Sequence, residues 1–513
     1  MGPPVRTALP RHQTLRATLD WSHELLTESD RVILRRLAVF AGAFTLEAAS
    51  AVAASVDISA AEVVDCVANL VGKSLLSADV AGAMAHYRLL ETTRAYARDK
   101  LDESRELEQC ARRHAEYHRE LFERAEAEWQ TRPTAEWLMA YGHQIANLRA
   151  ALDWAFSSDG DAIVAVALVT AAVPLWVSLS LLDELRARVE RALSTLESGS
   201  QPDPRRRMQL HAAVGWWLLY TRGRADETEA AWATALELAE RLDDTGYRLQ
   251  TLWGLWASCL ANAQFGAALP LAERFCRVAD NANPADRLIG DRMLGSSLHY
   301  LGDQSGARRH LMRMRSDLVR VQSDQPAKVR SASPSSPPCL SWPRAATGSR
   351  PSGTPALARV LWLQGLADEA MRTVVSIVDE AVSINHTLSL CNVLAEAACP
   401  VSLYAGDVAA AERFTAMLLD QTARHALDVF HAYGQCSKAC CSSSRGTSRS
   451  DCSFSTNFVA KTNGPSSLRH FSAGWRKVSP PQETRFRASR RSTRRWRDPS
   501  SPRSAGSRPN CCA

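Results

Sequence analysis

One phrase recurs along the chain: a turn residue followed by an amphipathic helix rich in small side chains. Its turn positions are Gly223, Asn262, Gly302, Gly365 and Gly406, which lie 39, 40, 63 and 41 residues apart. Paired helices that cannot bury their apolar faces alone must stack on neighbouring pairs. The repeat therefore predicts an α-solenoid.

The solenoid is predicted over residues 161–321 and 356–436. Its unit is a helical hairpin like that of the tetratricopeptide repeat (TPR), although the TPR period is shorter, about 34 residues. The tryptophans of the predicted solenoid are consistent with core packing, because aromatic side chains bury large areas between stacked helices. The alternative is a groove for an inducer or partner protein, with these candidate lining residues: Trp216, Trp217, Trp253 and Trp256.

Residues 12–100 contain three helical patterns followed by two short apolar runs, SLLSADV and AHYRLLE. Thr45 and Ser59 are predicted N-caps, and Glu62 stands at the capping-box position after Ser59. Gly72 is the predicted C-cap of the third helix. Three helices followed by a β-hairpin is the order of a winged helix.

The predicted third helix, residues 59–72, carries Glu62 and Asp65 and has no Lys or Arg before Lys73. In DNA-binding winged helices this helix enters the major groove, and basic residues hold phosphates. An acidic face would repel the DNA backbone. We therefore expect this module to make intramolecular contacts rather than to read DNA.

Residues 101–160 are predicted to form a helical linker. His114 and His118 lie four residues apart in H-A-E-Y-H, without the Glu that directly follows the first His of a zincin motif. We expect them on a solvated helical face.

The following stretch, Ala162–Leu182, is uncharged over 21 residues and long enough to span a bilayer. Pro174 and the flanking Asp161 and Asp183 favour a buried helical hairpin instead. We predict no membrane association.

The cysteines and histidines give no strong site pattern. Six cysteines lie in predicted apolar helices, and we expect them to be reduced thiols in the core: Cys66, Cys110, Cys259, Cys276, Cys391 and Cys399. Five other residues come near zinc-ligand spacing with low specificity: His425, His431, Cys436, Cys440 and Cys441. No catalytic motif is present, and Gly72-Lys73-Ser74 lacks the first Gly of a P-loop because position 67 is Val67. We predict no catalytic residue, no metal and no cofactor.

Two stretches differ from the helical text: a Ser/Pro-rich insert at 322–355 and a Ser/Arg-rich tail at 437–513. The tail holds 16 Lys+Arg and 3 Asp+Glu, whereas the whole chain has a net charge of +6. Neither stretch can form a core, so one explanation is a disordered linker and a disordered tail. The other is translation out of frame, because both interrupt the repeat without a stop signal. A solenoid that loses repeats in this way would expose an apolar end, so we expect aggregation.

Several phrases resemble one family in the right order: RHQTLRATLDWSHELL, LRRLAVFAGAFTLEAA, LVGKSLL and YRLLETTRAYARDKL, followed by HAEYHRELFERAEAEW and HQIANLRAALDWAF. The chain resembles the post-ATPase half of bacterial STAND-type regulators, which carry LuxR-like, AfsR-like or OmpR-like DNA-binding domains. The resemblance covers about residues 7–320 and 356–436. It implies a P-loop ATPase that precedes this region and repeats that sense an inducer or partner. In plant and animal relatives a His-Asp pair contacts the nucleotide, and the matching positions here are Leu90 and Glu91.

The predicted class is all-α, with a winged helix, a helical linker, an α-solenoid and a disordered C-terminal tail. The domain boundaries are 1–11 (N-terminal remnant), 12–100, 101–160, 161–321, 322–355, 356–436 and 437–513. The resulting hypothesis is a non-enzymatic, cytoplasmic regulatory fragment that lacks its ATPase and binds an inducer or protein partner on the solenoid.

Two alternatives remain. One is a free-standing TPR-like scaffold. The other is a nucleic-acid binder acting nonspecifically through the arginines of 485–499, with Trp496 available to stack on bases.

Overall fold

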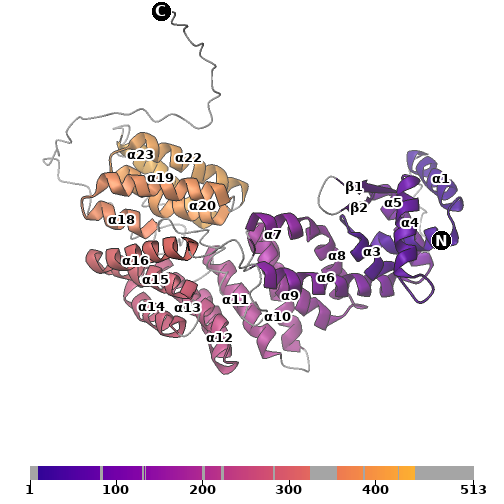
Figure 1. Cartoon of the computed structure of the whole chain (residues 1–513), viewed down its shortest axis with the longest axis horizontal. Coiled ribbons are helices and arrows are strands. Elements are labelled where there is room, and N and C mark those ends of the chain that lie inside the picture. The colour runs from indigo at the N-terminus through magenta and orange to yellow at the C-terminus, as the bar shows by residue number, and fades with distance from the viewer. Residues whose placement is uncertain are drawn as a thin grey trace, which may run out of the picture. The chain divides into compact units, whose positions relative to one another are not determined.

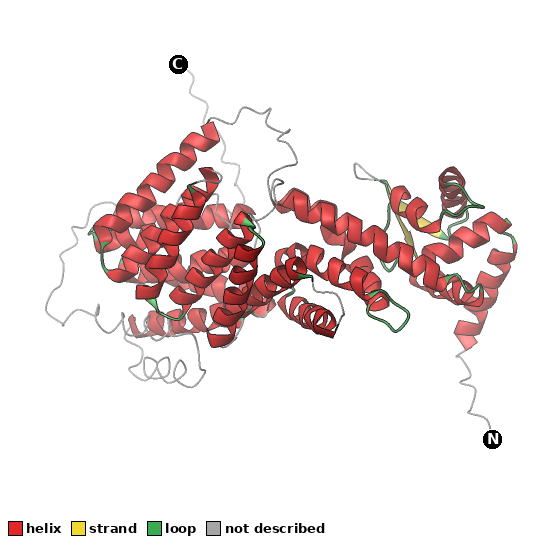
Figure 2. Ribbon diagram, turned by 90° about the horizontal axis from the view of Figure 1, so that it is seen from below, coloured by secondary structure: helices red, strands yellow, loops and turns green. Residues whose placement is uncertain are grey.

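The computed structural model describes residues 10–80, 85–129, 132, 134–198, 203–220, 225–280, 284–323, 355–384, 387–425 and 427–444. Within these ranges the chain is helical apart from one two-stranded sheet (Figures 1 and 2). The predicted all-α class is therefore confirmed. The predictions for the N-terminal remnant and for most of the insert and the tail fall outside the described residues.

The winged helix has the predicted element order. Its elements are α1 (Pro10–Glu24), α2 (Glu28–Arg36), the 3₁₀-helix η1 (Leu37–Val39), α3 (Leu46–Ala53), α4 (Ala60–Gly72), β1 (Leu76–Asp79), β2 (His86–Leu89) and α5 (Glu91–Glu103). The Thr45 hydroxyl accepts the amide of Ala48, and Ser59 and Glu62 form the capping box, so both N-caps are confirmed. The strands are antiparallel, with Leu76 opposite Leu89. A single bridge joins Phe44 to Tyr87, which ties the segment before α3 to the wing.

The end of α4 differs from the prediction by two residues. Gly72 is the last helical residue, and the left-handed position is Ser74, with φ of 58°. The amides of Ser74 and Leu75 donate to the carbonyls of Val71 and Leu70. This Schellman pattern satisfies the last carbonyls of the helix and directs the chain into the wing.

The linker consists of α6 (Leu107–Trp129), α7 (Thr134–Tyr141), η2 (Gly142–Gln144) and α8 (Ile145–Ala155), and the predicted solenoid begins with α9 (Ala162–Ser178). α6 packs against α3 on one side and against α8 and α9 on others. α9 is buried along nearly its whole length and continues through Pro174. The predicted burial is therefore confirmed, but the break at Pro174 was wrong, because packing on α6 and α10 (Leu182–Ser198) outweighs a proline cost of about 3 kcal/mol.

Among the described residues one helical stretch, Thr387–Tyr404, is long and apolar enough to cross a membrane, and 72% of it is buried inside the protein, whereas α9 is apolar but shorter. That burial is typical of a core helix.

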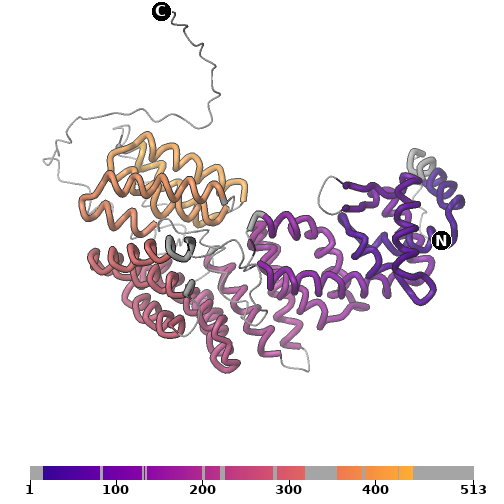
Figure 3. The backbone as a smooth tube through the Cα atoms, in the orientation of Figure 1, coloured from indigo at the N-terminus to yellow at the C-terminus, as the bar shows by residue number. Residues whose placement is uncertain are grey.

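The solenoid is a succession of helices in which each packs on the next (Figure 3). After α10 come α11 (Pro204–Tyr220), α12 (Ala225–Arg241), α13 (Thr245–Ala261), α14 (Phe265–Ala279), α15 (Pro284–Leu301), α16 (Gln304–Ser323), α18 (Pro355–Leu363), α19 (Ala367–Ile384), α20 (Thr387–Val393), the π-helix η3 (Leu394–Ala398), α21 (Cys399–Tyr404), α22 (Val408–Arg424) and α23 (Asp428–Ser444).

The predicted turn positions are confirmed at Gly302, Gly365 and Gly406, whose φ values are 96°, 82° and 76°. At Asn262 the left-handed residue is the following one, Ala263, with φ of 57°. Gly223 lies outside the described residues.

The stack continues across the insert, because α16 packs on α18 and Arg308 Nη1 donates to Gln364 Oε1 at 3.1 Å. α18 has only nine residues, whereas α13 has 17 and α15 has 18. A helix shortened at its N-terminal half fits the hypothesis that out-of-frame residues replace that half. The hypothesis stays a prediction.

The tail boundary at 437 needs a correction. α23 continues to Ser444, and Ser437, Cys440 and Cys441 are buried against the solenoid, because they extend the apolar stripe of this helix at three- and four-residue spacing. Asp428 and Lys438 lie exposed on the same helix. The described end of the solenoid therefore carries these two charged groups, and the expected aggregation stays a prediction.

Two glycines make room for one buried indole in the solenoid. A Cβ at Gly254 of α13 would lie 2.3 Å from the Trp232 ring, and a Cβ at Gly215 of α11 would lie 2.6 Å from it. We expect Gly254→Ala to lower the free energy of unfolding by about 1–3 kcal/mol, as overpacking does. Urea unfolding followed by tryptophan fluorescence measures this loss.

The matched control is Gly72→Ala, a helical position with no atom within 4 Å of the added Cβ. Its midpoint should stay or rise slightly, since Ala favours a helix over Gly by up to about 1 kcal/mol. Equal losses in the two variants would contradict the packing argument.

Candidate functional site

The outer face of α4 carries no positive charge. Glu62, Asp65, Ala68 and Asn69 are exposed there. The surrounding residues 26–102 hold eight Lys/Arg and ten Asp/Glu. A surface of this charge gains little from phosphate contacts. The intramolecular contacts expected of this module are made elsewhere, by the segment after η1 and by the wing.

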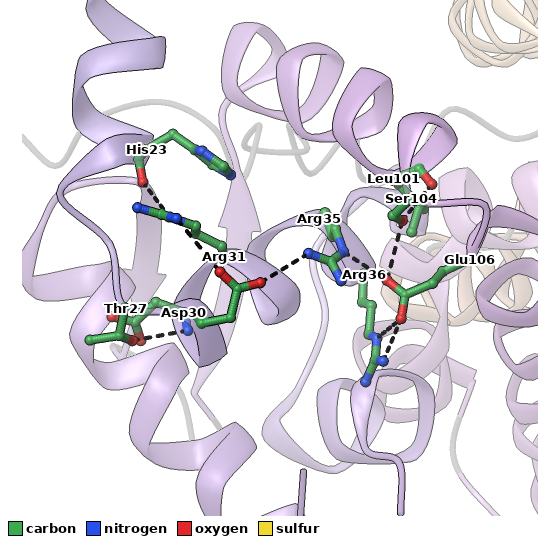
Figure 4. Close-up of polar contacts among 10 residues, drawn as sticks. His23, Thr27, Asp30, Arg31, Arg35, Arg36, Leu101, Ser104 and Glu106 are labelled. Carbon is green, nitrogen blue, oxygen red and sulfur yellow. Dashed lines mark hydrogen bonds and ion pairs between the residues drawn. The ribbon is translucent and has the colours of Figure 1, made fainter. Parts of the chain in front are cut away.

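Glu106, in the connection between α5 and α6, joins three parts of the winged helix (Figure 4). It accepts from Arg35 Nε at 2.7 Å and from Arg36 Nη2 at 2.5 Å. Arg36 Nη1 also donates to the carbonyl of Ala53 at the end of α3. Burial raises the pKa of Glu106, but the bonds from Arg36 and Arg35 outweigh burial and hold this pKa below its usual value. The ionised Glu106 therefore fixes the start of α6 to α2 and α3.

Arg31 holds the end of α1 in the same region (Figure 4). Its Nε donates to the carbonyl of His23 at 3.0 Å, and its Nη2 donates to the carbonyl of Glu24 at 2.7 Å. Both acceptors are the last carbonyls of α1, which have no partner within the helix.

His114 and His118 are not on a solvated face, so that prediction was wrong. Their exposed fractions are 2% and 0%, because α6 is covered by the winged helix as well as by the linker helices. The two imidazole rings lie 4.2 Å apart, and Phe40 packs on both at 5.0 and 6.2 Å. Burial lowers the pKa of His114 well below its ordinary value and that of His118 to about 4. Both are neutral at pH 7.

Asn147 of α8, which no sequence motif marks, joins the linker to the winged helix. Its Oδ1 accepts the amide of Gly42 at 2.8 Å, and its Nδ2 donates to the carbonyl of Ala43 at 2.8 Å. Nδ2 also donates to Gln144 Oε1 at 2.9 Å. Asn147 is fully buried, so these hydrogen bonds replace the bonds to water that its side-chain amide loses on burial.

A second contact joins the linker to the wing. The rings of His143 in η2 and His86 in β2 meet edge to face at 4.8 Å. His143 Nε2 lies 2.8 Å from Gln144 Nε2, and His118 Nε2 lies 3.4 Å from Gln144 Oε1. We call these residues, His86, His114, His118, His143, Gln144 and Asn147, the wing–linker joint. It is our candidate functional site.

The candidate groove residues lie mostly inside the solenoid. Trp216, Trp253 and Trp256 are 0%, 3% and 4% exposed, and the Trp216 and Trp253 rings lie 5.2 Å apart. Trp217 is half-buried under the Arg186 guanidinium, 4.6 Å from its ring. Core packing accounts for the three buried rings, because neighbouring helices close over them. The inducer groove stays a prediction, and these three rings cannot line its open surface.

The predicted core thiols are free cysteines, and all six are buried or half-buried. Burial raises the pKa of Cys66, Cys110 and Cys276 to about 11, so these thiols are protonated at pH 7. In the part of the chain that the structure describes, no three His, Cys, Asp or Glu residues are grouped to hold a metal ion. His431, one of the five residues near zinc-ligand spacing, lies with its Nδ1 3.0 Å from the Thr422 hydroxyl.

Leu90 and Glu91, which match the nucleotide-contacting His-Asp pair of plant and animal relatives, make different contacts here. Glu91 pairs with Arg94 at 3.0 Å, which lowers the pKa of Glu91, and Leu90 is exposed ahead of α5.

Comparison with known proteins supports the regulator resemblance. Residues 26–102 match a family model described as a winged helix-turn-helix domain. An HTH-type transcriptional regulator of Mycobacterium tuberculosis is 34% identical over 296 residues, which cover 55% of this chain and 32% of that protein. An uncharacterized protein of the same species is 40% identical over 111 residues, which cover 21% of this chain and 28% of that protein. The chain thus spans about a third of the length of these relatives. The resemblance to winged-helix transcriptional regulators is confirmed.

Two solved structures match this chain at low TM-scores. A STAND protein with a tetratricopeptide repeat sensor from Pyrococcus horikoshii covers 92% of this chain at 11% identity, with 66% of its own chain covered and a TM-score of 0.40. A Rap protein complexed with competence and sporulation factor covers 70% at 9% identity, with 97% of its own chain covered and a TM-score of 0.44.

The bonds of Asn147 make the first prediction for this site. We expect Asn147→Ala to destabilise the winged helix by about 1–3 kcal/mol, because the half-buried amide of Gly42 and the carbonyl of Ala43 lose their partner. Hydrogen exchange of residues 26–102 measures the loss. The exposed Asn69→Ala is the control and should leave exchange unchanged; equal exchange in both variants would refute the role of Asn147.

The buried imidazoles make the second prediction. A histidine whose folded pKa lies below its unfolded value of about 6.5 stabilises the fold above that pH. Because the pKa of His118 is about 4 in the fold, this stability should be lost as the pH falls from about 6.5 towards 4. Urea midpoints at pH 7.5, 6.0 and 5.0 should fall in the native chain and fall less in His118→Gln. A fall of the same size in the variant would assign the acid sensitivity to other groups.

Proposed function

We propose that this chain is the regulatory, non-enzymatic part of a STAND-type transcriptional regulator. In this proposal the solenoid binds an inducer or a partner protein, and the winged helix passes that state to an ATPase domain outside this sequence. The observation that carries the proposal is the wing–linker joint, in which Asn147 and His143 hold the winged helix against the linker. A winged helix held in this way can respond to the state of the solenoid without itself binding a specific DNA sequence.

The proposed mechanism is a shift between two states of the joint. A ligand acts only if it binds the solenoid in one of them more tightly than in the other. α6 supplies the connection, because it packs on α3 of the winged helix and on α9 at the start of the solenoid. The domain boundaries proposed above remain, with the end of the solenoid moved to Ser444.

The proposed setting is the cytoplasm, with no cofactor and no metal. DNA contact is proposed only through the basic tail or through a DNA-binding domain elsewhere in the intact regulator. Specific reading of DNA by α4 is opposed by the exposed carboxylates of Glu62 and Asp65.

A DNA-binding measurement tests this division of roles. The full chain should bind a random duplex weakly, with a steep loss of affinity between 50 and 200 mM salt, because contacts to phosphates release counterions. Four substitutions to Ser in the tail, at Arg490, Arg491, Arg494 and Arg495, should remove most of this binding in fluorescence anisotropy.

The matched variant is Asn69→Ala on the exposed face of α4, which should bind DNA as the native chain does. The opposite pattern, binding that survives the tail substitutions and is lost in Asn69→Ala, would make the winged helix a DNA reader and overturn the proposed function.

A further inference from the structure

The orientation of the Gln144 side chain follows from groups that cannot exchange donor and acceptor. The amide of Gly42 can only donate and the carbonyl of Ala43 can only accept, so Asn147 must present Oδ1 to the first and Nδ2 to the second. Nδ2 then donates to Gln144, which must present Oε1 towards Asn147 at 2.9 Å. Gln144 Nε2 therefore points at His143.

That orientation requires a neutral His143. Gln144 Nε2 is a donor 2.8 Å from His143 Nε2, so this ring nitrogen must carry a lone pair. The other ring nitrogen, Nδ1, is left to donate to the backbone carbonyl of Met139. Burial and the neighbouring His86 lower the pKa of His143, in agreement with the neutral form.

The opposite side of Gln144 has an unfavourable contact in this orientation. His118 Nδ1 donates to the carbonyl of His114 at 2.7 Å, so Nε2 of the neutral ring is an acceptor. It faces a second acceptor, Gln144 Oε1, at 3.4 Å. A reversed Gln144 amide would present Nε2 as a donor to His118 and Oε1 as an acceptor to a protonated His143, at the expense of one bond from Asn147.

We propose that Gln144 is a proton-driven, two-position switch between the linker and the wing. With His143 neutral, Gln144 bonds Asn147 and His143, and the wing is held. With His143 protonated, Gln144 reverses, Asn147 loses one of its three bonds, and the wing contact through His86 loosens. The switch is a property of the joint and needs no ligand on the solenoid.

The charged and titratable groups around the switch favour loosening. His86 faces His143 from β2, and like charges on the two rings at 4.8 Å would repel when both are protonated. His114 and His118 face Gln144 from α6, and Arg98 of α5 disfavours a proton on His114. None of these groups is a carboxylate that would hold a protonated His143 in place.

Hydrogen exchange of the full chain tests the switch. After correction for the intrinsic exchange rate, the wing amides between Leu76 and Leu89 should open roughly tenfold more often at pH 5.5 than at pH 7.5. His143→Gln should remove this difference, because the glutamine carbonyl accepts from Gln144 and does not titrate. His211→Gln, a half-buried histidine on α11, is the control and should keep the native response.

A second variant keeps the test decisive if His143→Gln disturbs the joint. Gln144→Glu offers acceptors to Asn147 and to a protonated His143 at the same time, so protonation requires no reversal and the wing should stay closed at pH 5.5. A native chain whose wing exchange does not depend on pH would overturn the proposal. So would an opening pH that stays the same in both variants, which is the behaviour of side chains with a merely structural role.

Discussion

The winged helix depends on one buried side chain, the amide of Asn147. It bonds the amide of Gly42 and the carbonyl of Ala43, two backbone groups that η1 and α3 leave unpaired where the chain turns between them. Asn147 is fully buried, whereas Gly42 and Ala43 are half-buried, so without Asn147 these two groups would lose their partner inside the protein. The same segment carries the Phe44–Tyr87 bridge, so the wing is positioned through it as well.

The buried histidines follow from that arrangement. α6 lies against α3 of the winged helix and against α9, and His114 and His118 are its buried polar residues. His114 and His118 tolerate this because an imidazole can lose its charge, whereas Lys or Arg at these positions would need a paired anion. Glu106, half-buried just before α6, keeps its charge because Arg35 and Arg36 bond to it.

The sequence predicted what is decided locally. The caps at Thr45 and Ser59, the wing hairpin and the glycine turns of the solenoid depend on residues a few positions apart, and the structure has them. Asn147 and His118 could not be predicted, since their partners lie 105 residues away at Gly42 and 26 residues away at Gln144. The only signal was a polar residue at a core position of a helical pattern, which occurs on solvated faces equally often. Which of the four tryptophans are buried could not be predicted for the same reason. Their spacing indicates a helix face, but it does not show which neighbouring helix covers that face.

The position of the joint along α6 explains why a small change there could reach the solenoid. α6 runs for 23 residues without a break, which corresponds to roughly 35 Å of rigid helix. Its first turns are fixed by Glu106 and its middle by the His114–His118 pair, while its last turns pack on α7, where the Trp137 indole donates to the carbonyl of Ala125. A helix fixed at three places moves as one body. A shift of the wing contact at one end must therefore be taken up at α7 and α9, the elements that lead into the solenoid. The coupling requires no flexible segment, because the same rigid helix is part of both contacts.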